Sequence, residues 1–587
     1  MKQSHSAIAG IVIAAGCLLA SAPATARSQQ PGQAAPAQAA PAQAAPARVV
    51  PAQVVPAAAL PGRCDTTVSM SNGGALSGMR VSRITAVTHP PTPLPGPAGK
   101  LVSHLHRTTR PATILRDFPV APGDTVDTLI VGEAMRRLRQ RSYIGMPTLA
   151  GVRCGTDSSI ALTLTTTDNW SLNPSFAAQS NSSYAGLEER NFLGTGKAGN
   201  VSLAAREGRL GGALGYADPF FLNLPIYLRL RMAEYGDGDE VRLRLRNAEQ
   251  SINNVWRYSL SISRYRRDTE KALAFGGTTV LISQAFHREG VFAVLGHRIG
   301  EVGEHANSIL FGFDFERAFL NAPDKSLTVG PKLVERRFHG ATVGIARRAA
   351  AYDTVGWMAE RHLLIDVPRG FETEGLLSFG REDVSRHAAA FGSIWVGRMW
   401  LEGTQKLATL DFWASGYRIG SRNNFDAASS RALFSSYTRH GSTLYTLHVS
   451  GEKLVNPDPD VRALATYDPT LPLIPEVYRL SENATAAELE SATHLRSPIH
   501  AFNLDAAAFT AASYRTASAL SQHDHYTVVA IGAGLRVIPG SHNSGTLRLD
   551  AFYPVIRSLN GRRGITFALS IAPWLQANRQ REDPRNR

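Results

Sequence analysis

The feature that most constrains the fold of this chain is a series of short segments in which apolar residues alternate with other residues. Beyond the N-terminus, the sequence has no long apolar run. Segments 227–232 and 241–246 alternate apolar residues with arginine, and segment 309–316 places Ile309, Phe311, Phe313 and Phe315 on one face. A period of two residues is that of a β-strand, whose successive side chains point to opposite faces. A helical membrane protein needs a run of about twenty apolar residues, and none follows the N-terminus. A barrel that crosses a bilayer with about ten residues per strand needs no such run.

The net charge of +14 raises the question of a nucleic-acid partner. The arginines are not gathered on one helix or tail, because in segments 227–232 and 241–246 they alternate with apolar residues on one face of strands. We therefore expect no nucleic-acid binding. That face would be solvated in a soluble sheet and would form a cationic lumen in a barrel. The mean hydropathy of −0.13 is compatible with both.

Residues 1–26 have the features of a secretory signal peptide. Lys2 supplies the positive charge, residues 7–20 form the apolar core, and Ala24 and Ala26 are the small residues of a cleavage site. A lipid anchor on Cys17 is the alternative, although no bulky aliphatic residue stands three positions before it.

Residues 27–63 are rich in proline, alanine and glutamine, and this composition predicts a disordered linker. Removal of the signal peptide at residue 26 would leave Cys64 and Cys154 as the cysteines of the mature chain. In an oxidising compartment these two cysteines can form a disulfide. Two unpaired buried thiols are the alternative.

Residues 64–170 mix strand and helix patterns. Segments 80–87 and 160–164 are predicted as strands, and segment 125–143 as a helix that Asp124 or Thr125 could cap. Segment 114–124, together with the end of that helix, resembles a POTRA domain. POTRA domains are the small periplasmic modules that precede the barrels of BamA, TamA and two-partner secretion transporters, and one such module fits here.

The barrel region carries further motifs of the same superfamily. Segment 186–196 (GLEERNFLGTG) resembles its first strand and turn, and segment 216–221 (YADPFF) resembles the turn that follows. Segments 532–536 and 547–554 resemble the closing hairpin. In this order, the motifs resemble those of the BamA/TamA-type outer-membrane assembly and translocation superfamily, also called the bacterial surface antigen family.

This resemblance implies a mainly β fold with a transmembrane antiparallel barrel. The barrel would occupy residues 171–575, with about sixteen strands for a region of this length. One small α+β POTRA-like periplasmic domain would precede it, and a polar tail over residues 576–587 would follow it.

In the superfamily, the first and last strands pair weakly, so that the seam can open and template an incoming strand. The resemblance places the first strand around Gly186 and the last after Ile565. Glycine and proline weaken strand pairing, although here they could simply end strands. The candidate seam residues are Gly186, Asn191, Phe192, Leu193, Gly194, Ile565, Phe567, Leu569, Ile571, Pro573 and Trp574.

Members also have an inward-folded loop with an Arg-Gly-aromatic motif that locks against the barrel wall. Arg369, Gly370 and Phe371 match this motif and are candidates for the lock. The alternative is a plain strand-end arginine, because the family's loop position corresponds to residues 455–496, which lack the motif.

The predicted function is insertion of outer-membrane proteins or translocation of polypeptides, without a catalytic residue, cofactor or metal. The expected partners are the outer-membrane bilayer, unfolded or β-rich polypeptides, and periplasmic or lipoprotein accessory factors. The N-terminal domain would lie in the periplasm. The alternative function is a passive anion-selective or lipid-handling pore with an arginine-lined lumen.

Overall fold

The computed structural model describes residues 64–572 with gaps. The gaps are residues 71–76, 92–102, 104–105, 146, 155–158, 180–181, 207–208, 236–237, 248–253, 276–277, 322–334, 358–362, 404, 421–426, 456–481, 496–501, 518–523, 540–545 and 558–563. The predicted signal peptide, linker and tail lie outside the described residues.

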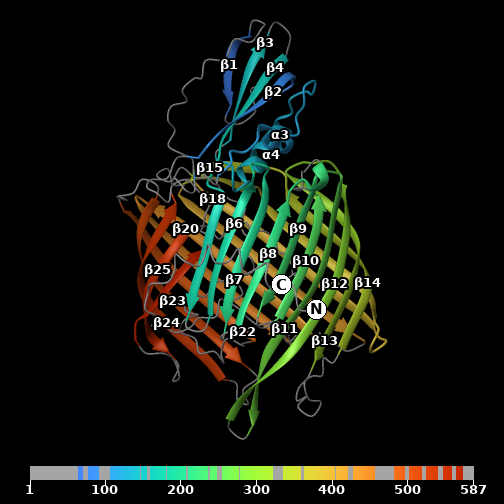
Figure 1. Cartoon of the computed structure of the whole chain (residues 1–587), viewed down its shortest axis with the longest axis vertical. Helices are drawn as coiled ribbons and strands as arrows, with labels where there is room; N and C mark the ends of the chain where they lie inside the picture. Colours follow the sequence, from blue (N-terminus) through green and yellow to red (C-terminus); the bar gives the residue numbers. More distant parts are fainter. Residues whose placement is uncertain are drawn as a thin grey trace, which may run out of the picture.

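As far as the structure describes it, the N-terminal domain is a four-stranded sheet with two helices packed on it (Figure 1). Its strand order is β1-β3-β4-β2, with β2 and β4 parallel and the other pairs antiparallel. The elements are β1 (Cys64–Met70), β2 (Arg80–His89), α3 (Pro111–Asp117), α4 (Thr128–Arg139), β3 (Thr148–Cys154) and β4 (Ser159–Thr167).

Alternation on β4 builds the core of this domain. Ile160, Leu162 and Leu164 are buried, and they pack in one cluster with Ile114 of α3 and Leu138 of α4. The predicted helix 125–143 is shorter in the structure. The prediction of its cap is wrong, because the Asp127 side chain, rather than that of Asp124 or Thr125, accepts a hydrogen bond from the Leu129 backbone N–H at 2.7 Å.

The strand register bears on the predicted disulfide. Cys64 and Cys154 are opposite one another in the β1–β3 ladder. Opposed residues of antiparallel strands have Cα atoms about 4.5–5.5 Å apart, a separation that a disulfide can span. The register is therefore compatible with a disulfide between Cys64 and Cys154, which stays a prediction.

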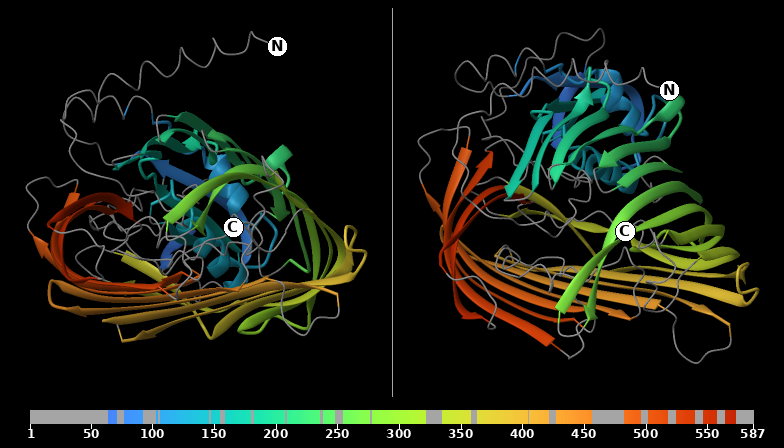
Figure 2. Two further views of the ribbon diagram at one scale, coloured as in Figure 1. Left: turned by 90° about the horizontal axis from the view of Figure 1, so that it is seen from below. Right: turned by 60° about the horizontal axis from the view of Figure 1, so that its bottom comes forward.

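Residues after 171 form a closed antiparallel barrel, which confirms the predicted fold class (Figures 1 and 2). In the part of the chain that the structure describes, the barrel has 20 strands, so the expectation of about sixteen is wrong. They are β5 (Leu172–Gln179), β6 (Ser182–Phe192), β7 (Lys197–Arg206), β8 (Arg209–Asp218), β9 (Ile226–Tyr235), β10 (Gly238–Asn247), β11 (Trp256–Phe275), β12 (Thr278–Ile299), β13 (His305–Asn321), β14 (Glu335–Ala349), β17 (Phe371–Glu382), β18 (Ala388–Glu402), β19 (Lys406–Ile419), β20 (Ala427–His440), β21 (Thr443–Val455), β22 (Asn483–Leu495), β23 (Phe502–Ala517), β24 (Asp524–Pro539), β25 (Thr546–Arg557) and β26 (Thr566–Ala572).

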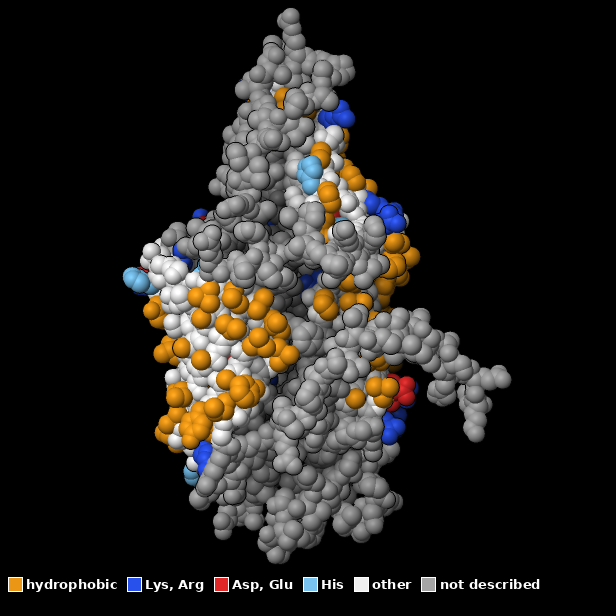
Figure 3. Space-filling view, turned by 60° about the vertical axis from the view of Figure 1, so that its left-hand side comes forward, with side chains coloured by type: hydrophobic (Ala, Val, Ile, Leu, Met, Phe, Trp, Pro, Cys, Tyr) orange, Lys and Arg blue, Asp and Glu red, His pale blue; other side chains and the backbone are white. Residues whose placement is uncertain are grey.

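The two faces of the barrel wall differ in chemistry. On β9 and β10, Met232 is 50% exposed and Val241 is 43% exposed, whereas the arginines of the same strands point the other way. Arg229 and Arg231 line a cavity together with residues 140–143 of the N-terminal domain, so the arginine face is the inner one. Hydrophobic side chains spread over the described outer surface in Figure 3. The alternating segments thus give an apolar exterior and a cationic inner face.

A separate hairpin interrupts the barrel order between β14 and β17. It consists of β15 (Tyr352–Trp357) and β16 (Leu363–Pro368), which form a two-stranded sheet of their own among the described strands. Figure 1 shows β15 at the barrel end that carries the N-terminal domain. Among the helices that the structure describes, none combines the length and the apolar character needed to cross a membrane.

Candidate functional site: the barrel closure and the domain docked beside it

The barrel closes between β26 and β5, which are neighbours in the strand order. Within the described residues these are the two shortest strands of the barrel, with 7 residues in β26 and 8 in β5, whereas β12 has 22. Pro174 lies within β5 and removes one backbone donor from its ladders. The closure is therefore the place where the barrel has the fewest backbone hydrogen bonds to lose.

One side of the predicted seam lies one strand away from the observed closure. Gly186, Asn191 and Phe192 lie on β6, which pairs with both β5 and β7 and is not a closing strand. The sequence did not reveal β5 because its segment, LNPSFAAQ, contains a proline and small residues rather than alternating large apolar ones.

The other side of the predicted seam lies on or next to β26. Phe567, Leu569 and Ile571 belong to β26, and Ile565 precedes it. Ile565 and Phe567 are 64% and 72% exposed, so they belong to the apolar exterior. Pro573 and Trp574 lie outside the described residues.

Leu193 and Gly194 belong to the turn between β6 and β7, which is the docking point of the N-terminal domain. The Arg110 backbone N–H donates to the Gly194 carbonyl at 2.9 Å, and the Thr113 hydroxyl donates to the same oxygen at 3.1 Å. Asn191 reaches the Thr109 hydroxyl at 2.8 Å. The sequence predicted a weak seam here, but these residues form a tight contact between two parts of the chain.

Two glycines make this contact possible. Gly194 has a φ of +73°, and a Cβ there would lie 2.4 Å from the Thr108 carbonyl oxygen. A Cβ on Gly196, also at φ +73°, would lie 2.4 Å from the Tyr143 hydroxyl. Any other residue would both strain the backbone and push the domain away from the turn.

The hairpin provides a second contact with the domain. Arg139 of α4 forms a bidentate ion pair with Asp366 of β16, at 2.6 Å and 3.2 Å. The Arg136 guanidinium lies 4.6 Å from the ring centroid of Tyr352 on β15. Burial opposes the charge on Arg136, but the carboxylate of Glu133 outweighs it and raises the pKa of Arg136 above its ordinary value.

The structure places the candidate lock residues at the base of this hairpin. Arg369 follows β16 and donates to the Asp353 carboxylate at 2.7 Å, and its side chain is 51% exposed. Gly370 has a φ of +81°, and Phe371 begins β17. Arg369 therefore fastens the two ends of the hairpin together. At the alternative loop position, residues 483–495 form strand β22, and residues 456–481 lie outside the described part.

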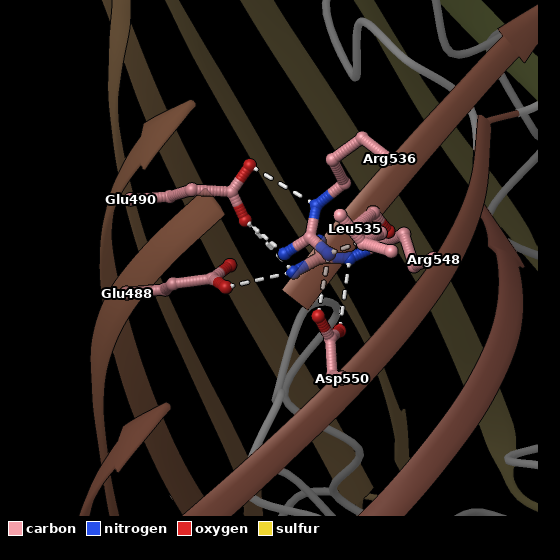
Figure 4. Close-up of polar contacts among 6 residues, drawn as sticks. All are labelled: Glu488, Glu490, Leu535, Arg536, Arg548 and Asp550. Atoms are coloured by element: carbon pink, nitrogen blue, oxygen red, sulfur yellow. Dashed lines mark hydrogen bonds and ion pairs between the residues drawn. The ribbon is translucent and has the colours of Figure 1, made fainter. Parts of the chain in front are cut away.

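An ionic cluster braces the wall beside the closure (Figure 4). Arg536 of β24 contacts Glu490 of β22 and Asp550 of β25, both at 2.5 Å. Arg548 of β25 contacts Glu488 and Glu490 at 3.0 Å, and Asp550 at 3.3 Å. Two guanidiniums thus bind three carboxylates across three strands. The sequence analysis missed this cluster because its partners lie up to 60 residues apart.

The structure therefore defines a class of protein: a β-barrel with one small domain docked on its rim. No family model matches the sequence, and no curated protein matches it. BamA from Haemophilus ducreyi, in a crystal structure lacking POTRA domains 1-3, is 11% identical with a TM-score of 0.34, and the alignment covers 84% of each chain. CdiB from Escherichia coli is 12% identical with a TM-score of 0.37, covering 86% of this chain and 80% of that one.

The siderophore receptor PirA from Pseudomonas aeruginosa is 8% identical, with a TM-score of 0.30, and the alignment covers 73% of this chain and 86% of that one. The solved structures similar to this chain thus include BamA and CdiB, two barrels of the superfamily that the sequence resembles, as well as a receptor barrel.

Proposed function

We propose that this chain is an outer-membrane factor that inserts or translocates polypeptides by opening the barrel between β26 and β5. The observation that carries this proposal is the meeting of the two shortest barrel strands at the closure. An unpaired strand edge in hydrocarbon costs several kcal/mol per unsatisfied backbone group, so a barrel opens where the fewest pairs are lost. The superfamily resemblance of the sequence supports the same mechanism.

The superfamily resemblance of the sequence supports a periplasmic N-terminal domain. Segment 114–124, together with the end of the helix that follows it, resembles a POTRA domain, which is a periplasmic module that precedes the barrel. The domain would therefore face the periplasm, and the barrel end that carries it would be the periplasmic end.

In this mechanism, an incoming strand pairs with the freed edges of β26 and β5. Backbone hydrogen bonds would supply the affinity, so that many different β-rich substrates could be accepted. The ionic cluster keeps β22, β24 and β25 together while the closure opens. The N-terminal domain sits one strand from the closure, at the β6–β7 turn, where it could present a substrate.

A disulfide across the closure tests the proposal. In a variant whose Cys64 and Cys154 are replaced by serine, cysteines at position 175 or 177 of β5 would be combined with one at 568 or 570 of β26. We expect oxidation to stop insertion of a test barrel protein into membranes, and reduction to restore it. The matched control joins β5 to β6 through Ala177→Cys and Tyr184→Cys, which are opposite in register. Full activity with an oxidised closure would refute the mechanism.

A further inference from the structure

Two neighbouring strands carry like charges opposite one another on the inner face of the barrel. Arg229 of β9 is the register partner of Arg244 of β10, and Arg231 is the partner of Arg242. Glu240 contacts Arg231 and Arg242, each at 3.2 Å. Like charges directly opposite on adjacent strands destabilise a sheet, so this arrangement costs stability unless something of opposite charge joins it.

These arginines border a cavity beneath the N-terminal domain. Arg229, Arg231 and Arg246 line it from the barrel wall, and residues 140–143 line it from the domain. Residues 140–143 include a serine and a tyrosine, whose hydroxyls are further hydrogen-bonding groups. The cavity is thus lined by several arginines and by two residues with hydroxyl groups.

Two other arginines of the cavity have carboxylate partners, and the Arg246 guanidinium lies 4.7 Å from the ring centroid of Tyr227. Arg190 of β6 lines it and contacts Glu188 at 2.8 Å, and Arg231 contacts Glu240. Arg229 has no carboxylate partner among the residues that the structure describes. An unbalanced positive charge therefore remains at Arg229.

Arg244 adds to this imbalance. It too has no carboxylate partner in the described part of the chain, and its Nε is buried without a hydrogen bond there. A partly buried arginine without a counter-ion is unfavourable, because its charge has lost part of its hydration. Arg229 and Arg244 are opposed in register, so two uncompensated charges lie side by side on the inner wall, and Arg229 lines the cavity.

We propose that this cavity binds a phosphate group, with Arg229 as its principal ligand and Arg244 as the second source of positive charge. A phosphate carries up to two negative charges and several acceptor oxygens, which match two planar guanidinium donors. The phosphate could be inorganic or belong to a lipid headgroup. The site is separate from the barrel closure and does not depend on whether the closure opens.

The full mature chain in a zwitterionic detergent tests the proposal by isothermal titration calorimetry. Inorganic phosphate is titrated at constant ionic strength, with chloride as the replacing anion. We expect saturable binding to the unmodified protein, and an affinity at least about tenfold lower in the double variant Arg229→Gln, Arg244→Gln, because two charge-assisted contacts are lost. The control is Arg264→Gln on β11, whose side chain is 71% exposed and which should bind phosphate normally.

A second titration separates the two sources of phosphate. A short-chain phosphatidic acid is compared with the matching phosphatidylcholine in the same three proteins. Binding of phosphatidic acid at least about tenfold tighter than inorganic phosphate, and lost in the double variant, would support a lipid headgroup. Binding of inorganic phosphate with no such gain would support the free anion.

Three outcomes would overturn the proposal: no saturable binding of either probe, equal binding to the unmodified protein and the double variant, or equal loss in Arg264→Gln. The heat-dependent shift of each protein on gels shows that its barrel is folded. A barrel that inserts substrates normally but binds no phosphate would remove this site and leave the proposed function standing.

Discussion

Two regions of the inner barrel wall both place arginines on neighbouring antiparallel strands. They differ in how many of these arginines have carboxylate partners. In the cluster on β22, β24 and β25, two arginines contact three carboxylates. On β9 and β10, five arginines share the inner face, and Glu240 contacts two of them, Arg231 and Arg242. The first region satisfies its charges internally and braces the wall. The second leaves charge uncompensated, which is expected of a surface that binds something else.

The largest change in the free energy of unfolding should come from removing an arginine from the ionic cluster on β22, β24 and β25. Arg536→Met leaves Glu490 and Asp550 without their 2.5 Å partner in a region where Arg536 is only 4% exposed. Removing one partner of a buried ionic network typically costs about 3–5 kcal/mol. Urea unfolding, followed by the heat-dependent gel shift, measures this loss. Arg264→Met, which removes an exposed arginine, should cost less than about 1 kcal/mol. Equal losses in the two variants would show that the cluster does not brace the wall.

A smaller effect of opposite sign should follow from adding a carboxylate to the uncompensated region. Arg244→Glu would place a negative charge opposite Arg229, turning repulsion into attraction. We expect the free energy of unfolding to rise by about 1 kcal/mol, within the range of cross-strand charge pairs. The same urea measurement, in buffer without phosphate, checks this. A destabilised variant would mean that Arg229 and Arg244 do not repel one another in the folded barrel.

The smallest effect should come from removing one charge without replacing it. Arg244→Gln should raise the free energy of unfolding by roughly 0.5 kcal/mol at low ionic strength. High salt screens the repulsion, so this gain should shrink as chloride is added. The free energy of unfolding that Arg536→Met loses should change much less with salt, because the charges of the ionic cluster are buried. A gain independent of salt would point to packing rather than to charge.

Much of the fold could be predicted from periodicity, because alternation is a local property of the sequence. Segments 227–232 and 241–246 form β9 and β10 with apolar residues outward and arginines inward. Phe311 and Phe313 are about half exposed on the outer face of β13. The number of strands was underestimated, since β5 has no such alternation and most strands with their connections are shorter than assumed.

The site was harder to predict because it depends on contacts between distant segments. The sequence shows Gly194 and Gly196 only as turn residues. The reason that they must be glycine is the approach of Thr108 and Tyr143, which come from another part of the chain. The pairing of Arg139 with Asp366 spans 227 residues and has no local pattern. Periodicity assigns a residue to a face, but it does not identify the partner that the residue meets there.

The docking contacts of the N-terminal domain have a mechanical consequence. They lie at the β6–β7 turn, at Phe220 of the β8–β9 connection, whose ring centroid is 4.3 Å from the Arg116 guanidinium, and at the hairpin that follows β14. A body fixed at several points along a rim resists rotation. Release of the ion pair at the hairpin alone would leave the domain attached at the β6–β7 turn and at Phe220, so its position on the rim does not depend on one contact.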